Sequence, residues 1–395
     1  MINDGMANDM TKDLIYLDNN ATTRVAPEVV EAMLPYLSEF FGNPSSAHTL
    51  GRTMKQAVEH SREQVATLLG AADTSEIVFT SCGSESDNWA IRGALESQPD
   101  KKHIVTTLVE HEAVRNVCRA LEGEGYEVTW MGVNEHGEID LDILRDALRP
   151  DTALVSIMLA NNETGVLFSV NEIGRLVRER SKALFHVDGV QAVGKIPIDL
   201  TGVDLFALSG HKLHAPQGIG ALYIRKGVSL PSFIIGGAQE QGRRAGTSAV
   251  PNIVGLGAAC KLAQEDDDHS RIRDLRDRLE SGILENIPNT RRNGNPANRL
   301  PNTSNISFEY VEGQNIMLHL DQLRICVSTG SACHSTTHQS SPTLHAMNVP
   351  YTAAQGSIRF SLGRYNTDDD IENTLRVLPE IIEKLAAMSP YKVLS

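Results

Sequence analysis

The sequence predicts an α/β protein with a large domain around a mostly parallel, seven-stranded sheet and a smaller α+β domain. Short apolar runs alternate with helical patterns from Pro27 to Arg225, as they do in βαβ units. Most of these runs are apolar throughout, so helices should cover both faces of the sheet. After Pro251 the alternation ends and long charged helical stretches follow, which indicates a second domain.

The large domain is expected at residues 22–258. Its predicted strands are residues 76–80, 103–106, 126–130, 152–159, 183–187, 204–208 and 219–224. Pro27 should begin a helix that ends near Phe40, because proline is favoured in the first turn of a helix. In sheets of this kind ligands bind at the carboxyl ends of the strands, so functional side chains should follow the strands.

The smaller domain is expected to combine residues 1–21 with residues 259–395. The charged run between residues 265 and 278 indicates a solvent-exposed helix face. A loop is predicted at residues 293–296, strands near residues 305–309 and 357–362, and a last helix from about Asp368. A loop at about residues 328–342 should belong to this domain.

The composition argues against several classes of partner. The chain has 395 residues, with 36 Lys and Arg against 50 Asp and Glu, and the net charge of −14 disfavours duplex nucleic acid and anionic membrane surfaces. We find no apolar run of membrane-spanning length, and the start of the chain lacks the basic and apolar parts of a signal peptide. Five cysteines without a CxxC pair are typical of reduced thiols, so we expect a cytoplasmic protein.

The first candidate site is the turn after residues 76–80, where Gly83 and Ser84 open a helix. Free backbone amides and the helix dipole at such a position attract an anion, and the Ser84 hydroxyl adds a donor. An ordinary helix N-cap has the same residue types and explains this turn equally well when it is taken alone.

Two charged residues follow other strands. Asp188 ends a buried strand, where a carboxylate needs a cationic partner such as a protonated pyridine nitrogen; a helix-capping aspartate is the alternative. Lys212 follows Ser209-Gly-His211 just past a further strand. A partly buried lysine has a lowered pKa and can form a Schiff base, whereas a lone lysine is usually a solvated surface charge.

The strand ends also carry amides and a histidine. Asn161 and Asn162 can offer hydrogen-bond donors to a ring hydroxyl or to a substrate. His111 lies between Glu110 and Glu112 after another strand, and an imidazole there can stack on a flat ring or move protons near neutral pH. The alternative is a histidine with satisfied hydrogen bonds at the start of a helix.

Cys333 has the setting of a reactive thiol. Small residues precede it and polar residues follow it, which predicts an exposed loop where a thiolate can react. By contrast, Cys118, Cys260 and Cys326 lie on apolar patterns and should belong to the core. Cys82 borders the turn at Gly83 and fits either role.

A zinc site is the alternative at this loop, because His334, His338 and His345 follow Cys333 closely. Their spacing matches no closed zinc pattern, and a mobile loop is a poor cage for a metal ion. We therefore expect no metal.

Several motifs, in one order along nearly the whole chain, resemble the class I cysteine desulfurases of the NifS/IscS group. They are residues 16–23, 41–46, 110–111, 161–163, 186–188, 209–212, 236–240, 243–247, 330–333 and 357–360. The resemblance implies a fold-type I architecture that depends on pyridoxal 5'-phosphate, assembled as a homodimer. It also implies conversion of L-cysteine to L-alanine, with the sulfur held as a persulfide on Cys333.

The resemblance assigns the cofactor contacts motif by motif. Lys212 would bind the cofactor covalently, His111 would stack on its ring, and Asp188 would pair with the ring nitrogen. Asn162 and Gln191 would contact the ring oxygen. The phosphate would be bound by Gly83, Ser84, Ser209 and His211, and Thr247 would reach the phosphate of the neighbouring subunit.

The same resemblance assigns the substrate contacts. Arg359, with Asn162, would hold the substrate carboxylate, and Cys333 would attack the substrate sulfur. The persulfide would then pass to a protein acceptor such as an iron–sulfur scaffold; nitrogenase assembly, tRNA thiolation and DNA sulfur modification start from the same persulfide.

Two departures from the family pattern bear on the activity. Ser84 stands where threonine is usual, and it keeps the hydroxyl. His334-Ser335 stands where Thr-Ser is common, and Cys-His-Ser is similar to selenocysteine lyases, so a selenocysteine lyase is the main alternative. A non-catalytic assembly scaffold would be expected to lack Lys212 or Cys333, and a plain aminotransferase would leave Cys333 without a role.

Overall fold

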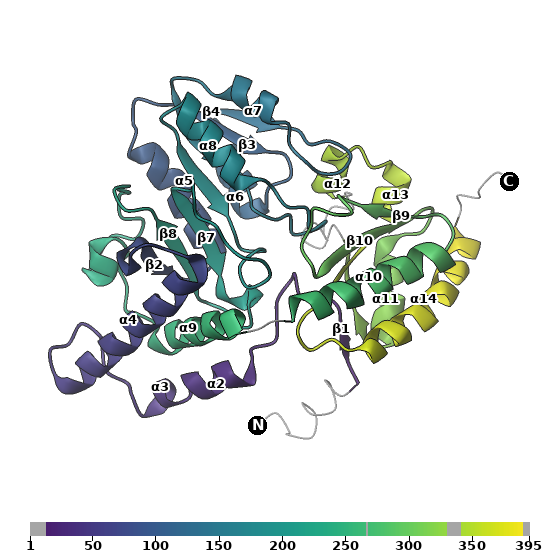
Figure 1. Ribbon diagram of the computed structural model, residues 1–395, viewed down its shortest axis with the longest axis horizontal. Helices are drawn as coiled ribbons and strands as arrows, with labels where there is room; N and C mark the ends of the chain where they lie inside the picture. The colour runs from purple at the N-terminus through teal and green to yellow at the C-terminus, as the bar shows by residue number, and fades with distance from the viewer. Residues whose placement is uncertain (1–12, 266–267, 330–340, 390–395) are drawn as a thin grey trace.

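The computed structural model describes residues 13–265, 268–329 and 341–389. Figure 1 shows two lobes, one around a long twisted sheet and one around a shorter sheet, with the two sheets well separated. No helix in these ranges is both long and apolar enough to cross a bilayer.

The sheet of the larger lobe confirms all seven predicted strands. They are β2 (Ile77–Thr80), β3 (His103–Thr107), β4 (Glu127–Met131), β5 (Thr152–Ser156), β6 (Leu184–Asp188), β7 (Leu205–Ser209) and β8 (Gly220–Ile224). Their order is β2-β8-β7-β6-β5-β3-β4. β8 runs antiparallel to both of its neighbours, and the other pairs are parallel, so the sheet is mostly parallel as predicted.

Helices cover both faces of this sheet (Figure 1). They are α4 (Thr49–Leu69), α5 (Gly83–Glu96), α6 (Glu112–Gly123), α7 (Leu141–Ala147), α8 (Val170–Arg180) and α9 (Val250–Glu265). One prediction was wrong: the helix expected from Pro27 to Phe40 is split into α2 (Pro27–Met33) and α3 (Pro35–Ser38). Pro35 has no backbone N–H and cannot continue the hydrogen bonding of a helix.

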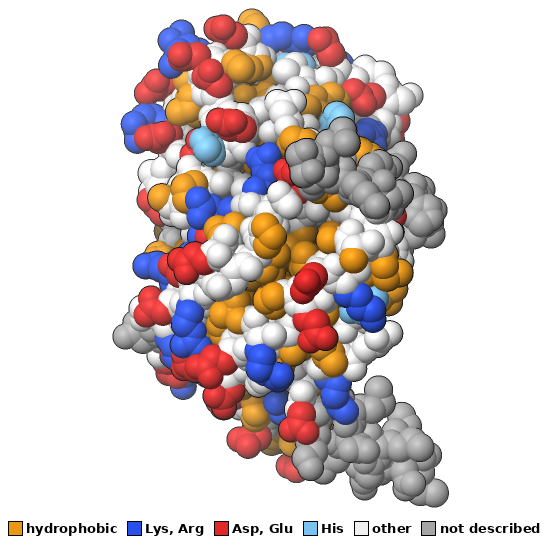
Figure 2. All heavy atoms as spheres, turned by 90° about the vertical axis from the view of Figure 1, so that its right-hand side faces the viewer, with side chains coloured by type: hydrophobic (Ala, Val, Ile, Leu, Met, Phe, Trp, Pro, Cys, Tyr) orange, Lys and Arg blue, Asp and Glu red, His pale blue; other side chains and the backbone are white. Residues whose placement is uncertain are grey.

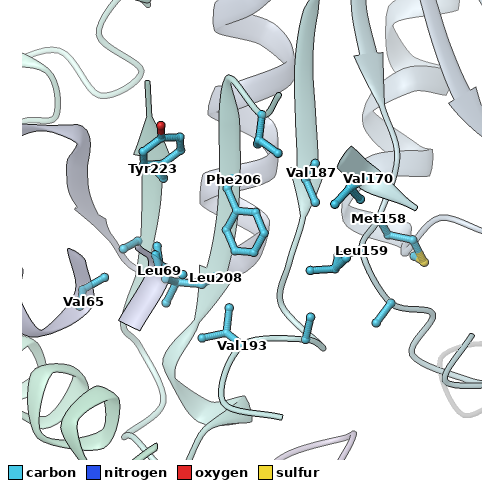
Figure 3. Close-up of a cluster of buried hydrophobic side chains, with 14 of the residues drawn as sticks. Val65, Leu69, Met158, Leu159, Val170, Val187, Val193, Phe206, Leu208 and Tyr223 are labelled. Atoms are coloured by element: carbon cyan, nitrogen blue, oxygen red, sulfur yellow. The ribbon is translucent and has the colours of Figure 1, made fainter. Parts of the chain in front are cut away.

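Successive side chains of the strands point to opposite faces of the sheet and belong to two hydrophobic cores, one on each face. On β7, Leu205 packs with residues of α5 and α6, whereas Phe206 packs with residues of α4, α8 and α9. Figure 3 shows part of the second core, in which Phe206 is flanked by Val187 and Tyr223 from the adjacent strands. Gly189 makes room for the Phe206 ring, because a Cβ there would lie 1.9 Å from its Cζ. The carboxyl end of β6 is thereby fixed by core packing.

The smaller lobe contains an antiparallel sheet in the order β12-β13-β10-β9. Its strands are β9 (Thr290–Asn293), β10 (Thr303–Phe308), β12 (Ser328–Thr329) and β13 (Ser357–Ser361). Its helices are α10 (His269–Asn286), α11 (Gly313–Gln322), α12 (Pro342–Ala346), α13 (Tyr351–Gln355) and α14 (Asp368–Met388). The expected strands and last helix are confirmed, whereas β9 was not predicted, since its sequence Thr-Arg-Arg-Asn has no apolar residue.

The N-terminal segment joins the smaller lobe. β1 (Ile15–Tyr16) pairs in parallel with β11 (Ile325–Cys326), and Leu17 belongs to a core cluster with residues of α10, α11 and α14. We propose the division predicted from the sequence, residues 22–258 against residues 1–21 with 259–395. The membership of Leu17 in this cluster supports the placement of residues 1–21, whereas α9 continues past residue 258 and packs as a whole on the larger lobe.

Figure 2 shows hydrophobic side chains gathered on the outer face of the smaller lobe, with charges of both signs around them. Tyr351 and Met388 have exposed fractions of 68% and 73% and line a hollow of about 350 Å³.

Candidate active site

A cavity of about 410 Å³ lies where the ends of β2, β3, β5, β6 and β7 meet residues of the smaller lobe. It brings together all the residues to which the family resemblance assigned a role, except Thr247 and Cys333. They are Gly83, Ser84, His111, Asn162, Asp188, Gln191, Ser209, His211, Lys212 and Arg359. Cys333 lies outside the described residues, whereas Thr247 is exposed and lines a separate cavity of about 200 Å³.

One end of the cavity is built to receive an anion. Residues 79–84, called the phosphate turn below, connect β2 to α5, whose N-cap Cys82 makes no side-chain capping bond. The first amides of a helix have no partner within it. A Cβ on Gly83 would lie 2.8 Å from Val190 Cγ2, so only glycine lets the start of α5 pack against the end of β6. The turn thus combines helix amides with the Ser84 hydroxyl.

Ser209 and His211 also line the cavity, at and just after the end of β7, and Ser209 lies beside Gly83. Burial, with Lys212 and Lys195 nearby, lowers the pKa of His211 to about 4. The imidazole is therefore neutral at neutral pH. Its Nδ1 lies 3.1 Å from the Thr22 hydroxyl, and the ring can offer its other nitrogen to the anion.

Asp188 is the last residue of β6, and it is 6% exposed. Its Oδ1 accepts the amide of Val190 at 2.9 Å. Burial raises the pKa of Asp188, whereas the nearby His111 lowers it, as do the amide of Val190 and Lys212. A carboxyl group in this position is stabilised in its charged form by a cation beside it, so the site fits a protonated ring nitrogen.

His111 stands at the start of a helix, as one of the two interpretations of the sequence expected, and it also faces the cavity. It is the N-cap of α6, and its Nδ1 accepts the amide of Ala113 at 3.2 Å; its ring also lines the cavity. Burial lowers the pKa of His111. A neutral His111 that accepts at Nδ1 has its proton on Nε2, so at that atom it is a proton donor.

Lys212 ends a short 3-10 turn, η2 (Gly210–Lys212), directly after β7. Its Nζ donates to the backbone carbonyl oxygens of Asn20 at 2.6 Å and Ala21 at 2.7 Å. The N-terminal segment therefore holds the amino group at the wall of the cavity. The alternative of a solvated surface lysine does not describe this residue.

Of the amide side chains considered from the sequence, Gln191 and Asn162 line the cavity and Asn161 does not. Gln191 lines the cavity; its Nε2 donates to the carbonyl oxygen of Asn20 at 3.0 Å, and its Oε1 accepts from Lys195 at 2.9 Å. Asn162 also lines the cavity. Asn161, offered as a second donor, instead accepts the amides of Glu163 and Thr164 at 2.9 Å each and stabilises its own turn.

Arg359 reaches the cavity from β13 of the smaller lobe. Its Nη1 donates to the carbonyl oxygen of Asn162 at 3.0 Å, and its Nη2 donates to Asp18 at 2.8 Å. The buried Nε has no partner among the described residues. A fixed guanidinium with donor capacity to spare suits a carboxylate ligand.

Several acidic residues of the cavity, among them Asp18, Asp87 and Glu110, were not assigned a role from the sequence. Asp18 contacts Arg359, and Asp87 lies 3.4 Å from the ring of His186, with both side chains almost fully buried. Burial raises the pKa of Glu110 to about 8 and also raises that of Asp87. The sequence signals were the place of Asp18 within the motif at residues 16–23 and the adjacency of Glu110 to His111. The burial of these side chains was not visible, because it comes from distant segments.

Four further cysteines lie within the described residues, and they differ in burial. Cys118 and Cys260 are buried as predicted, whereas Cys326 and Cys82 are half-buried. Within the described ranges, no group of three or more His, Cys, Asp or Glu residues could hold a metal ion. Cys333, His334 and His338 are outside those ranges, so the expectation of no metal stays a prediction.

Comparison with known proteins gives a consistent result. The family model for aminotransferase class-V matches residues 15–374. The chain is 56% identical over 383 residues to a cysteine desulfurase of Trichormus azollae, covering 96% of this chain and 95% of the relative. It is 49% identical over 381 residues to the cysteine desulfurase NifS of Azotobacter vinelandii, covering 95% and 94%. The solved structure of a NifS-like protein superimposes with a TM-score of 0.89 at 39% identity, covering 94% of this chain and 100% of that one.

Proposed function

The chain belongs to the class I cysteine desulfurases of the aminotransferase class-V family, and we propose that the 410 Å³ cavity between its lobes is where cysteine loses its sulfur. The protein uses pyridoxal phosphate to convert L-cysteine to L-alanine and passes the sulfur to an acceptor. One observation carries the proposal: Lys212, Asp188 and Arg359, which come from distant parts of the chain, line this single cavity.

The cavity fits the cofactor in its residue types. The phosphate turn, with Ser84, Ser209 and the neutral His211, would hold the phosphate group. Asp188 would pair with the ring nitrogen, and when bound the cofactor withdraws electrons from the α-carbon of the substrate. His111 would lie against the ring, and Gln191 would face the ring oxygen, where Lys195 fixes the direction of its amide.

Three residues of the chain would act on the substrate, each in a different step. Arg359 would bind the substrate carboxylate through its donors, and the contact with Asp18 keeps the guanidinium in the cavity. The amine of Lys212 is the group that would accept the α-proton, since His111 is a donor at Nε2. The thiolate of Cys333 would form a bond to the substrate sulfur while the carbon–sulfur bond breaks.

We also propose a homodimer. Thr247 is exposed and does not line its own subunit's main cavity, which supports its predicted contact with a neighbouring subunit's phosphate. Phe41 and Ile235 have exposed fractions of 77% and 90%, and a second subunit would bury such side chains. A cytoplasmic location and an iron–sulfur scaffold as acceptor belong to the same proposal, and the family membership supports them.

Asp188→Asn should lower the turnover of cysteine by at least about 100-fold, because an amide keeps the shape but not the charge beside the ring nitrogen. Alanine formation measured by chromatography tests this, with cofactor content measured in the same samples. Asp199→Asn, at an exposed site with its own local hydrogen bonds, is the matched control and should behave as wild type. Near-normal turnover by Asp188→Asn would show that another carboxylate has this role.

Arg359→Lys should raise the Michaelis constant for cysteine by about 10- to 100-fold. Lysine offers a point charge in place of a planar pair of donors, and a charge-assisted hydrogen bond contributes about 1.5–3 kcal/mol. Steady-state kinetics with an absorbance check of the cofactor measures this. Arg291→Lys on the edge strand β9, outside the cavity, is the control; an unchanged Michaelis constant for Arg359→Lys would leave Arg359 a structural role only.

A further inference from the structure

Two carboxylates join the phosphate turn to the loop that ends at Thr247, residues 236–247. Glu240 of this loop accepts the amide of Phe79 at 3.0 Å and pairs with both terminal nitrogens of Arg62, at 2.6 and 2.9 Å. Each partner of this ion pair is almost completely buried, with side-chain exposures of 7% and 6%. The loop is thus anchored directly to Phe79, the first residue of the phosphate turn.

In the second link the carboxylate belongs to α5, beside the turn, and the arginine belongs to the loop. Glu85, in the first turn of α5, accepts the amide of Ser81 at 2.7 Å. The same carboxylate pairs with Nε and Nη2 of Arg244 in the loop, at 2.8 and 3.1 Å. The amides of Phe79 and Ser81 are therefore each held by a carboxylate whose other partner is an arginine, and each of the two bridges crosses from turn to loop.

The loop has a backbone that needs such anchoring. Glu240 and Gln241 have φ angles of +48° and +59°, in the left-handed region that non-glycine residues rarely adopt. Strained backbone persists only where surrounding contacts hold it. Arg62 provides further support, because its Nη1 also donates to the carbonyl oxygen of Ile77 at 2.8 Å and its guanidinium lies 4.7 Å from the centre of the Phe79 ring.

We propose that Glu240 and Glu85 couple the phosphate turn to the 236–247 loop. Binding of the cofactor's phosphate at the turn then also seats the loop, which means that it holds the loop in the conformation described above. Coupling of two sites is reciprocal, so seating the loop strengthens phosphate binding at the turn. In the homodimer of the proposed function, on which this step rests, the seated loop presents Thr247 to the partner's phosphate. The two cofactor sites then bind cooperatively.

Limited trypsin digestion measures how well the loop is held in place, because trypsin cleaves after arginine and both Arg243 and Arg244 lie within the loop. The rate of cleavage after these residues is followed by mass spectrometry in the holoenzyme and after removal of the cofactor. We expect removal to speed this cleavage by about tenfold in wild type. Holoenzyme carrying Glu240→Gln should be cut about as fast as the wild-type protein without cofactor.

Glu59→Gln is the matched control, because Glu59 also pairs with Arg62, at 3.2 Å, but is half-exposed and lies on α4. It should keep wild-type protection. Arg244→Lys breaks the second bridge while preserving a tryptic site, and it should lose protection as Glu240→Gln does. Circular dichroism of each variant checks that the fold is retained.

Cofactor titration of the stripped protein tests the cooperativity. Wild type should show a Hill coefficient above one, and Glu240→Gln a coefficient of one. Cleavage that does not depend on the cofactor, or equal cleavage of Glu240→Gln and Glu59→Gln, overturns the coupling. Cofactor-dependent protection in a protein that elutes as a monomer supports the coupling and refutes the homodimer instead.

Discussion

Lys212→Ala should lose essentially all conversion of cysteine to alanine. The variant lacks the only amine that lines the main cavity among the described residues, and loss of proton transfer by such a group alone costs about 10²–10⁴ in rate; loss of the covalent attachment adds to this. The phosphate turn and Asp188 remain, so the variant should still bind the cofactor. Alanine release and cofactor absorbance, measured on the same samples, separate the two effects.

Borohydride reduction of the wild type identifies the attachment point independently. We expect a pyridoxyl group on the peptide that contains Lys212. Lys226→Ala removes a lysine whose side chain is 76% exposed and pairs with Asp73, and this control should keep full activity and the same label. A label on Lys195, which also lies near the cavity, would move the assignment to that residue.

Cys333→Ser should nearly abolish the release of alanine and sulfide from cysteine while cofactor binding survives. A thiolate is a soft nucleophile for the substrate sulfur, and a serine hydroxyl of similar size is a far poorer one. Addition of cysteine should still change the absorbance of the cofactor, because the residues of the described cavity are intact. Retention of full desulfuration would remove Cys333 from the mechanism.

Mass spectrometry locates the transferred sulfur. After wild type is incubated with cysteine and no reductant, the extra sulfur should be on Cys333 and not on Cys82 or Cys326. Cys82 and Cys326 are both half-buried, whereas Cys118 and Cys260 are buried, so Cys82 and Cys326 are the other thiols that sulfur could reach. Cys82→Ser and Cys326→Ser therefore serve as controls. If Cys333→Ser turns over selenocysteine but not cysteine, the enzyme also acts as a selenocysteine lyase, since selenium leaves without a thiolate.

The sequence was most informative where one local pattern decides the structure. Continuous apolar runs predicted all seven strands of the large sheet. The polar residues that follow two of these runs, Asp188 and Lys212, were predicted to be functional, and both line the cavity. The direction of β8 was not predictable, because an apolar run has no direction. The division of the first helix follows from Pro35, whose missing N–H ends α2 although the helical pattern of side chains continues around it.

Contacts between distant segments account for what was missed. Asn20 and Asp18 hold Lys212 and Arg359, yet they lie far from both in sequence and belong to no periodic pattern. The Glu240–Arg62 pair joins a loop to a helix across 178 positions. Burial decides the pKa of Asp87 and Glu110, and burial at the edge of a sheet depends on which segments cross it.

The pairing of β1 with β11 determines how late in the synthesis of the chain the cavity can be completed. Ile15 and Tyr16 find their partners only at Ile325 and Cys326, and Asp18 pairs further on, with Ser361. The ribosome therefore releases nearly the whole chain before the segment that holds Lys212 and Arg359 can settle, and such non-local contacts form slowly. The larger lobe can fold during translation, but the cavity that receives the cofactor is complete only after the C-terminal segments have been synthesised.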